Sequence, residues 1–424
     1  MAYDRPQAVS LPDASACIRR PTAVDLFCGI GGMGLGFEQA GFDVLVAVDA
    51  DPQLAAIHKY NHPASRTICR DILGFGARAR EELELGHAEI DVVLGGPPCQ
   101  GFSVIGKRQF DDPRNDLVEA FAIAAVALRP RYVVMENVEG LALKPMRAHL
   151  DNAREILANA GYASADPFVA DAADFGVPQR RRRVLLLAWL GSERALSAPV
   201  PTHASEERST LRPMVTVNDA IGRLADQRRR ASEYVRWLND ANEHLSATRL
   251  GAPEDLTGMG LTKHSRATVD RFAATPQGAE ETVSRYTRLR WDGQCHTMRA
   301  GTGPDHGSFM SARPIHPSQP RVITVREAAR LHGYPDWFQF HRTKWHSFRG
   351  IGNSVPPPMA RAVAASVVAA LQLNPRKAGS VGLGDAALLA HDPRQAADAF
   401  GVDPTKNVRR TRKRRHESDV QSAI

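Results

Sequence analysis

Hydrophobic and polar residues follow a regular order over residues 22–190. Short apolar or β-branched runs are separated by longer stretches in which apolar residues recur with helical spacing. The runs predict strands at residues 23–27, 44–48, 91–94, 132–135 and 184–189, and the longer stretches predict helices at 52–60, 116–128 and 145–160. Strands that alternate with helices predict βαβ units, and therefore an α/β fold with a mostly parallel sheet covered by helices on both faces.

The pattern changes after about residue 191. Residues 197–320 are rich in Pro, Gly, Thr, Arg and His and have no long apolar period, which predicts a smaller, loop-rich domain. Helical patterns return at 324–332 and 359–371, and the chain becomes polar beyond residue 374. The predicted organisation is a flexible arm (1–20), a first α/β part (21–196), the loop-rich domain (197–320), a returning α/β part (321–373) and a basic, disordered tail (374–424).

The composition is that of a soluble globular protein, with 43% hydrophobic and 24% charged residues among 424. Because no apolar stretch is long enough for a membrane span and no secretion signal precedes the first strand, we expect a cytoplasmic protein without a membrane partner. The five cysteines are widely spaced and never form a CxxC pair, which argues against disulfides and against a metal site.

The net charge of +7 is uneven, since residues 401–424 hold seven Lys and Arg against three Asp and Glu. A basic chain is compatible with a nucleic-acid partner but does not establish one. A charge run of this kind is usually a solvated segment, and direct contact with DNA is the less favoured alternative.

A glycine-rich turn follows the first strand at residues 25–34, and the second strand ends at Asp49. Glycines allow close approach of a ligand to the backbone, and a carboxylate about 20 residues further on can accept hydrogen bonds from ribose hydroxyls. This order favours a nucleoside-bearing cofactor over a plain surface turn. Asp71 and Ile72 follow the third strand, where Asp71 is either a ligand of an amino group or a helix cap.

The stretch GGPPCQGFS at residues 95–103 places Cys99 at the carboxyl end of a buried strand. Pro97 and Pro98 fix φ and remove two amide donors, so the thiol lies on a rigid corner at the edge where open α/β sheets bind ligands. A nucleophilic cysteine explains this frame better than a buried apolar one.

Glu136 follows the next strand at the same edge, where a desolvated carboxyl group can act as a general acid. A capping acid is the alternative for Glu136 taken alone. Four successive arginines, residues 180–183, lead into a further strand, so at least two of them are expected to face the site. The turn at 352–358 includes Asn353 and Ser354, which are possible hydrogen-bond partners of a charged ligand.

Together these motifs resemble the ordered motif series of the DNA (cytosine-5) methyltransferases, over about residues 22–190 and 320–372. The resemblance rests on DLFCGIGG, Asp49, Asp71-Ile72, GGPPCQGFS, Glu136-Asn137-Val138, the arginines with Gln179, TVREAARL at 324–331 and GNSVPP at 352–357. It implies a Rossmann-like S-adenosylmethionine-dependent methyltransferase domain, with 197–320 as the target-recognition domain between its two parts.

The resemblance also implies the roles of individual residues. The S-adenosylmethionine pocket would be formed by Phe27, Gly29, Ile30, Gly31, Asp49, Asp71, Ile72, Pro98, Asn353 and Ser354. The catalytic residues would be Cys99, Glu136, Asn137, Arg181 and Arg183. The DNA contacts would be made by Gln100, Ser103, Arg114, Arg181 and Arg183.

The implied reaction is methylation of cytosine C5 in a specific duplex DNA sequence, after the base has left the helix and Cys99 has attacked C6. Double-stranded DNA is the expected partner of a monomeric enzyme. A restriction endonuclease that acts on the same site would complete a restriction-modification system without direct contact. The alternatives are a nicotinamide-dependent dehydrogenase, which leaves Cys99 and Glu136 unexplained, and an inactive nucleic-acid-binding protein or a tRNA methylase.

Overall fold

The computed structural model describes residues 18–73, 75–98, 117–143, 146–205, 210–224, 231–253, 255–301 and 313–403. Within these residues, an eight-stranded sheet has the order β3-β2-β1-β4-β5-β8-β6, and β7 also pairs with β8. The strands are β1 (Thr22–Leu26), β2 (Asp43–Asp49), β3 (Arg66–Cys69), β4 (Val92–Gly95), β5 (Tyr132–Val138), β6 (Tyr162–Ser164), β7 (Phe168–Asp171) and β8 (Arg182–Leu190). Strands β1 to β5 pair in parallel, and β8 pairs antiparallel with β5, β6 and β7. The prediction of a mostly parallel α/β sheet is therefore confirmed.

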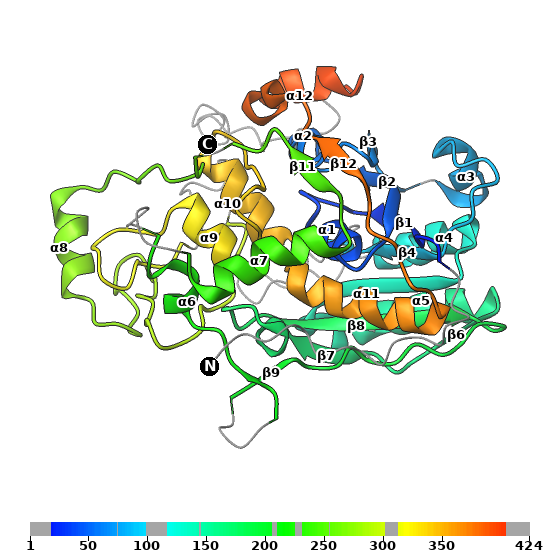
Figure 1. Cartoon of the computed structure of the whole chain (residues 1–424), viewed down its shortest axis with the longest axis horizontal. Helices are drawn as coiled ribbons and strands as arrows, with labels where there is room; N and C mark the ends of the chain where they lie inside the picture. Colours follow the sequence, from blue (N-terminus) through cyan, green and yellow to red (C-terminus); the bar gives the residue numbers. More distant parts are fainter. Residues whose placement is uncertain are drawn as a thin grey trace, which may run out of the picture.

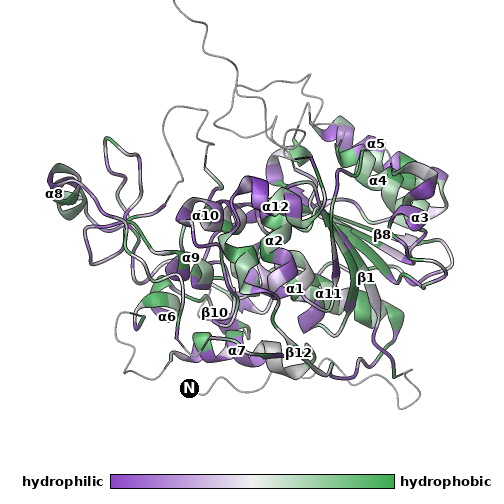
Figure 2. Cartoon of the chain, turned by 90° about the horizontal axis from the view of Figure 1, so that it is seen from above, coloured by the Kyte–Doolittle hydropathy of each residue, from purple (hydrophilic) through white to green (hydrophobic). Residues whose placement is uncertain are grey.

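Helices cover both faces of this sheet (Figure 1). Helices α1 (Gly32–Gln39) and α11 (Pro357–Leu371) pack on one face, and α4 (Leu117–Leu128) and α5 (Arg147–Asn159) pack on the other. Successive strand residues alternate between the two cores: Val92 points to α1 and α11, and Val93 points to α4 and α5. Because both faces are covered, the strands β1 and β8 are hydrophobic throughout most of their length (Figure 2).

The remaining short elements connect these layers or extend them. Helix α2 (Pro52–Asn61) packs against β2 and β3. The small helices on the connections are η1 (Gly76–Arg78), α3 (Ala79–Glu82), η4 (Glu139–Ala142) and η5 (Ala172–Phe175). Parallel strands end at one edge of the sheet, so the segments after β1, β2, β3, β4 and β5 meet there.

The segment after β8 leaves the sheet, and part of it lies on the left of Figure 1, where α8 (Arg266–Ala274) is farthest from the strands. Its elements are β9 (His203–Ala204), β10 (Arg212–Pro213), α6 (Val217–Ile221), α7 (Glu233–His244), β11 (Thr248–Leu250) and α8 (Arg266–Ala274). The chain then returns through α9 (Val325–Leu331) and α10 (Lys344–Asn353). The domain boundaries named above stay predictions.

Besides the apolar clusters on the two faces of the sheet, a third apolar cluster lies between the α/β part and the loop-rich part. It joins Ile30 and Ile57 of the α/β part to Tyr234, Leu289 and Met298 of the loop-rich part. The stretch Lys344–Leu371, which spans α10 and α11, is long and apolar enough to cross a membrane, but most of it is buried inside the protein. It is therefore a pair of core helices.

The prediction of a disordered segment from residue 374 is wrong for residues 374–403. This segment forms β12 (Ser380–Gly382), η7 (Ala386–Ala390) and α12 (Pro393–Ala399), and β12 pairs with β11. Leu388 of η7 is buried against Ala56 and Tyr60 of α2, which gives the segment an apolar core of its own. Residues 404–424, which hold the basic run, lie outside the described residues.

The flexible-arm prediction is also wrong at its last residues. Arg19 binds Asp91 through two hydrogen bonds of 2.6 Å, and Arg20 binds Asp43 at 2.6 Å. These contacts anchor the chain before β1. The rest of the arm, residues 1–17, lies outside the described residues.

Candidate active site

The glycine-rich turn after β1 adopts backbone conformations that glycine favours. Gly29 has φ of 55° and Gly31 has φ of 94°, and Phe27, which is partly buried, also lies in the left-handed region with φ of 63°. A side chain on Gly31 would collide with the His62 ring, whereas a Cβ on Gly29 would meet no atom within 4 Å. Gly29 therefore faces open space at the sheet edge, and Gly31 faces the interior.

Asp49 joins this turn to the end of β2. One carboxylate oxygen accepts the Gly29 amide at 2.8 Å and the other accepts the Asp51 amide at 2.8 Å. Burial raises the pKa of Asp49 to about 6, and the neighbouring Asp51 carboxylate adds to the rise. The acid thus contacts the glycine-rich turn and organises it, while its predicted contact with a ribose stays a prediction.

The other predicted cofactor residues near β1 and β3 differ in how deeply their side chains are buried. Ile30 is fully buried and its side chain packs against Leu54 and Gly350, so its main chain alone faces the edge. Ile72 is a core residue, while Asp71 is exposed and accepts the Leu73 amide at 3.0 Å. Asp71 has the cap-like contact that was the alternative to its ligand role.

The ends of β4 and β5 lie side by side and bring Glu136 and Asn137 to the proline turn. The Glu136 carboxylate lies against Gly96, with Oε2 3.1 Å from where a Cβ of Gly96 would be. Asn137 donates from Nδ2 to the carbonyl oxygen of Pro97 at 3.0 Å and accepts the Val138 amide at 2.8 Å. Pro98, partly buried, is the last residue of this turn that the structure describes. Cys99, Gln100, Ser103 and Arg114 lie outside the described residues.

Glu136 forms a buried ion pair with Arg183 from the neighbouring strand β8. Arg183 Nε is 2.8 Å from Glu136 Oε1, and each side chain retains about a tenth of its surface exposed. Burial lowers the pKa of the Arg183 guanidinium, and the Glu136 carboxylate opposes this change. The pair fixes the second carboxylate oxygen of Glu136 beside the proline turn.

The four arginines alternate, as the strand geometry predicts. Arg181 and Arg183 point inward, whereas Arg180 and Arg182 are exposed and pair with Asp171 and Glu139. Arg181 is buried, and its guanidinium donates to three main-chain carbonyls, those of Met298 (3.0 Å), Gly352 (2.9 Å) and Ser354 (2.9 Å). Arg181 thus connects segments far apart in the sequence, a role that the sequence did not predict.

The turn after α10 reaches back to the glycine-rich turn. A Cβ on Gly32 would collide with the carbonyl oxygen of Val355 and would lie 3.1 Å from the Cβ of Ser354. Ser354 is buried and donates from its hydroxyl to the Ile351 carbonyl at 3.0 Å, while Asn353 is exposed. The structure therefore brings this returning turn beside the predicted cofactor residues of β1.

Three other thiols in the described part of the chain are poor nucleophiles. Burial raises the pKa of Cys69 and of Cys295 to about 12, and burial also raises the pKa of Cys28 well above its usual range. These thiols stay protonated at neutral pH, and the thiolate is the reactive form. None of these three thiols is therefore a candidate for the nucleophile.

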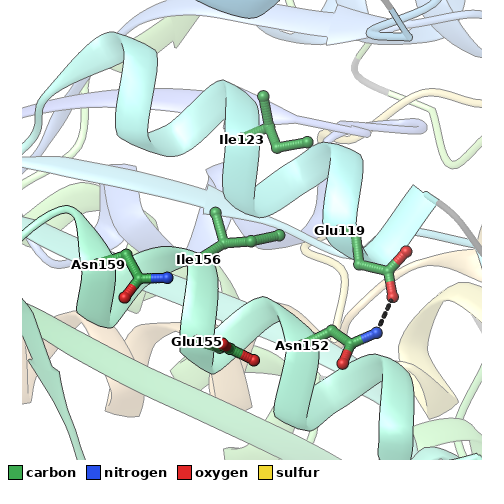
Figure 3. Close-up of a pocket in the computed structure, with 6 residues that line it drawn as sticks. All are labelled: Glu119, Ile123, Asn152, Glu155, Ile156 and Asn159. Atoms are coloured by element: carbon green, nitrogen blue, oxygen red, sulfur yellow. Dashed lines mark hydrogen bonds between the residues drawn. The ribbon is translucent and has the colours of Figure 1, made fainter.

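A separate surface groove of about 440 Å³ lies between α4 and α5 (Figure 3). Its floor includes Ile123 and Ile156, and Asn152 donates to Glu119 at 2.9 Å across one end. None of its lining residues is among the predicted site residues. This groove is on a helical face and is distinct from the sheet edge that carries the site.

One residue at the site was missed by the sequence reasoning. His332, directly after α9, is fully buried, and its Nε2 lies 3.0 Å from the Ser354 carbonyl oxygen. No local signal distinguishes it, because its partners are 22 and 153 residues away in the sequence.

Comparisons with known proteins agree with this geometry. Residues 22–369 match the family described as C-5 cytosine-specific DNA methylase. The chain is 44% identical to the type II methyltransferase M.XorII of Xanthomonas oryzae pv. oryzae, over 94% of this chain and 98% of the relative. It is 31% identical to the type II methyltransferase M.AgeI of Thalassovita gelatinovora, over 82% of this chain and 99% of the relative.

Solved structures show the same fold. One described as a DNA modification methyltransferase encoded within a prophage (E. coli) aligns with a TM-score of 0.68 and 32% identity, over 83% of this chain and 99% of that chain. The S. pombe Dnmt2 methyltransferase aligns with a TM-score of 0.52 and 18% identity, over 82% of this chain and 99% of that chain. The second comparison supports the fold alone.

Proposed function

The chain belongs to the C-5 cytosine-specific DNA methylases and is a DNA (cytosine-5) methyltransferase, and from this premise we propose how its residues act on one specific sequence of duplex DNA. The target cytosine leaves the helix, enters the edge of the sheet and is attacked at C6 by Cys99. This membership is not compatible with the nicotinamide-dependent dehydrogenase considered from the sequence.

The residues at the sheet edge fit S-adenosylmethionine, which supplies an electrophilic methyl group when bound. Gly29 faces open space, and Asp49 lies within hydrogen-bond distance of its amide. In the proposed pocket, Phe27, Gly29, Ile30 and Gly31 line the cofactor and Asp49 accepts from the ribose hydroxyls. Asp71, Ile72 and Pro98 line the adenine side, and Asn353 and Ser354 close the pocket from the returning turn.

The proposed reaction begins with the Cys99 thiolate, which forms a bond to C6 of the cytosine. Glu136 contacts N3 and the exocyclic amino group and supplies a proton at N3, so that negative charge does not accumulate on the ring. C5 then has enough electron density to take the methyl group. Loss of the C5 proton to solvent, departure of the Cys99 thiolate from C6 and return of the N3 proton to Glu136 restore the aromatic ring and both side chains.

The arginines and Asn137 hold the reacting groups in position. Arg183 keeps Glu136 oriented through its ion pair at 2.8 Å, and we propose that it also reaches the base. Asn137 holds Pro97, two residues before Cys99, by the bond to its carbonyl oxygen. Arg181 supports the surrounding segments, while Gln100, Ser103 and Arg114 are proposed to contact DNA.

The observation that carries this proposal is the meeting of Glu136 and Asn137 with the Gly96–Pro97 turn. A carboxyl group held beside the turn that leads to a cysteine is the arrangement that addition of a thiol to a pyrimidine requires. The family membership gives this arrangement its substrate.

We further propose that the enzyme acts in the cytoplasm as the modification half of a restriction-modification system. Its relative M.XorII is named a type II methyltransferase. The endonuclease would act on the same site without binding this chain, which would work as a monomer.

The experiment is transfer of labelled methyl groups to duplex DNA, followed by digestion and identification of the labelled base. We expect 5-methylcytosine with the native enzyme and no product with Cys99→Ser. Label on adenine, or on the exocyclic amine of cytosine, would contradict the proposal, and label on tRNA alone would favour the tRNA alternative. Sequencing of methylated genomic DNA, with and without the gene expressed, identifies the recognition site.

A further inference from the structure

A chain of hydrogen bonds joins Met298, in the predicted target-recognition domain, to Ser354, on the turn that follows α10. The Met298 amide donates to Gln179 Oε1 at 3.0 Å, which fixes the other end of the Gln179 amide as a donor. Gln179 Nε2 then donates to His332 Nδ1 at 3.1 Å. His332 must therefore carry its proton on Nε2, from which it donates to the Ser354 carbonyl oxygen at 3.0 Å.

The neutral state of His332 agrees with this assignment. The ring is fully buried, and burial lowers its pKa well below the usual range, with the neighbouring Arg181 adding to the decrease. A neutral imidazole with one donor and one acceptor nitrogen has the right polarity for Gln179 on one side and Ser354 on the other.

A second, parallel connection joins the same two segments. Arg181 donates to the Met298 carbonyl and to the Gly352 and Ser354 carbonyls. In addition, Gly352 packs directly on the Arg299–Ala300 peptide, where a Cβ would collide with the Arg299 carbonyl group. Residue 298 and residue 354 are thus held together by two side-chain routes and by close backbone packing.

The two connected segments belong to different parts of the predicted enzyme. Met298 lies in the predicted target-recognition domain, on the stretch that also pairs with residues 178–180 through the Cys295 main chain. Ser354 lies on the turn that contacts the glycine-rich turn at Gly32. A shift of the recognition segment on DNA would therefore change the position of the turn that closes the cofactor pocket.

We propose that His332 is a positioning residue that couples DNA binding to cofactor binding through Gln179 and Ser354. This inference rests on the proposed function, because it takes Ser354 as part of the cofactor pocket and residues 197–320 as the DNA-binding part. His332 touches neither the cofactor nor the base, and acts through the position of residue 354.

The test measures the dissociation constant of S-adenosylhomocysteine with and without a duplex that the native enzyme methylates. We expect the duplex to tighten binding to the native enzyme by roughly fivefold or more. In His332→Ala the two values should agree within about twofold, because each lost hydrogen bond is worth about that fivefold factor. The KM for S-adenosylmethionine should rise by roughly fivefold at saturating DNA while kcat changes by less than about twofold.

Two further variants separate positioning from general loss of packing. The ratio compared is that of the S-adenosylhomocysteine dissociation constants without and with the duplex. His332→Gln keeps an acceptor and a donor at the required ends and should retain the native ratio. His332→Asn is too short to span both partners and should lose it. His203→Ala is the matched control, because His203 is another buried histidine, packed on Gly176 and outside this hydrogen-bond chain. It should keep the native ratio.

Each outcome bears on the inference. A native ratio of one, an unchanged ratio in His332→Ala, or an equal loss in His203→Ala would overturn it. If His332→Ala does not fold, the Asn and Gln variants decide, and equal ratios for these two would overturn it as well. The native enzyme is first checked for 5-methylcytosine formation, so a failure of the proposed function would be seen before any variant is compared.

Discussion

Replacing Arg183 by methionine would leave the Glu136 carboxylate buried without its cationic partner. In the native structure the two groups are 2.8 Å apart, and about a tenth of each side chain is exposed. Removal of one member of a buried ion pair costs about 3 to 5 kcal/mol. We expect a loss of about 3 kcal/mol in the free energy of unfolding near pH 7.5, the lower end of that range, because a little water still reaches both side chains.

The loss should depend on pH, and its sign follows from the unpaired carboxyl group. In Arg183→Met the buried Glu136 carboxylate has no cationic partner, so burial penalises its charged form in the folded state, whereas a neutral carboxyl group would carry a smaller penalty. The variant is then less destabilised at low pH, where carboxyl groups are protonated, and more destabilised as the pH rises. The deficit relative to the native enzyme should therefore shrink between about pH 7.5 and pH 5.

Urea denaturation followed by tryptophan fluorescence at the two pH values measures this deficit. The control is the double variant Glu136→Gln with Arg183→Met, which removes both charges and should recover most of the stability. A deficit below about 1 kcal/mol, a deficit that does not change with pH, or strict additivity of the two substitutions would refute the reasoning.

Four further predictions follow from the site and from the C-terminal segment. Protonation of Asp49, whose pKa is raised to about 6, should weaken S-adenosylhomocysteine binding below that pH, and calorimetry should find this pH dependence absent in Asp49→Asn. Asn137→Ala should lower kcat by roughly tenfold with little change in the KM for S-adenosylmethionine, because Pro97 is no longer held. Gly31→Ala should lower the melting temperature strongly because its methyl group collides with His62, while Gly29→Ala should unfold nearer the native temperature and lose S-adenosylhomocysteine binding. Leu388→Ala should destabilise the protein by about 2 to 4 kcal/mol in chemical denaturation, and an effect under about 0.5 kcal/mol would contradict the packing of η7 on α2.

Much of the sheet could be predicted from the sequence because each strand is a short apolar run with a turn after it. β5 extends three residues beyond its predicted end. Glu136 and Asn137 therefore lie within the strand, directly before its last residue Val138, and not in a loop. Their meeting with the proline turn follows from the parallel pairing of β4 and β5. Local pattern and sheet geometry were sufficient for this part of the site.

The contacts of Arg181 and His332 could not be predicted in this way. The alternation of the arginines indicates that two of them point inward, but it does not indicate that Arg181 binds the carbonyls of Met298 and Ser354, more than one hundred residues away. His332 has no pattern of its own, since the two partners of its side chain, Gln179 and Ser354, lie 153 and 22 residues away in the sequence. Such contacts depend on the packing of the whole chain.

The C-terminal segment, in contrast, contained a signal that was overlooked. Asp392 precedes Pro393 and is followed at the third position by Gln395, which together form a capping box with proline at the start of α12. The polar composition of the segment alone predicts disorder. Its few apolar residues suffice because they form one cluster with Ala56 and Tyr60 of α2.

The central claim is that the Cys99 thiolate bonds to the cytosine ring beside Glu136. The most direct measurement is peptide mapping by mass spectrometry after the enzyme is incubated with S-adenosylmethionine and a duplex that carries 5-fluorocytosine at the methylated position, because fluorine at C5 prevents the final elimination. We expect a nucleotide attached to the peptide that contains Cys99, and no adduct with Cys99→Ser. An adduct on Cys28, Cys69 or Cys295, or methylation of C5 by the Cys99→Ser variant, would contradict it.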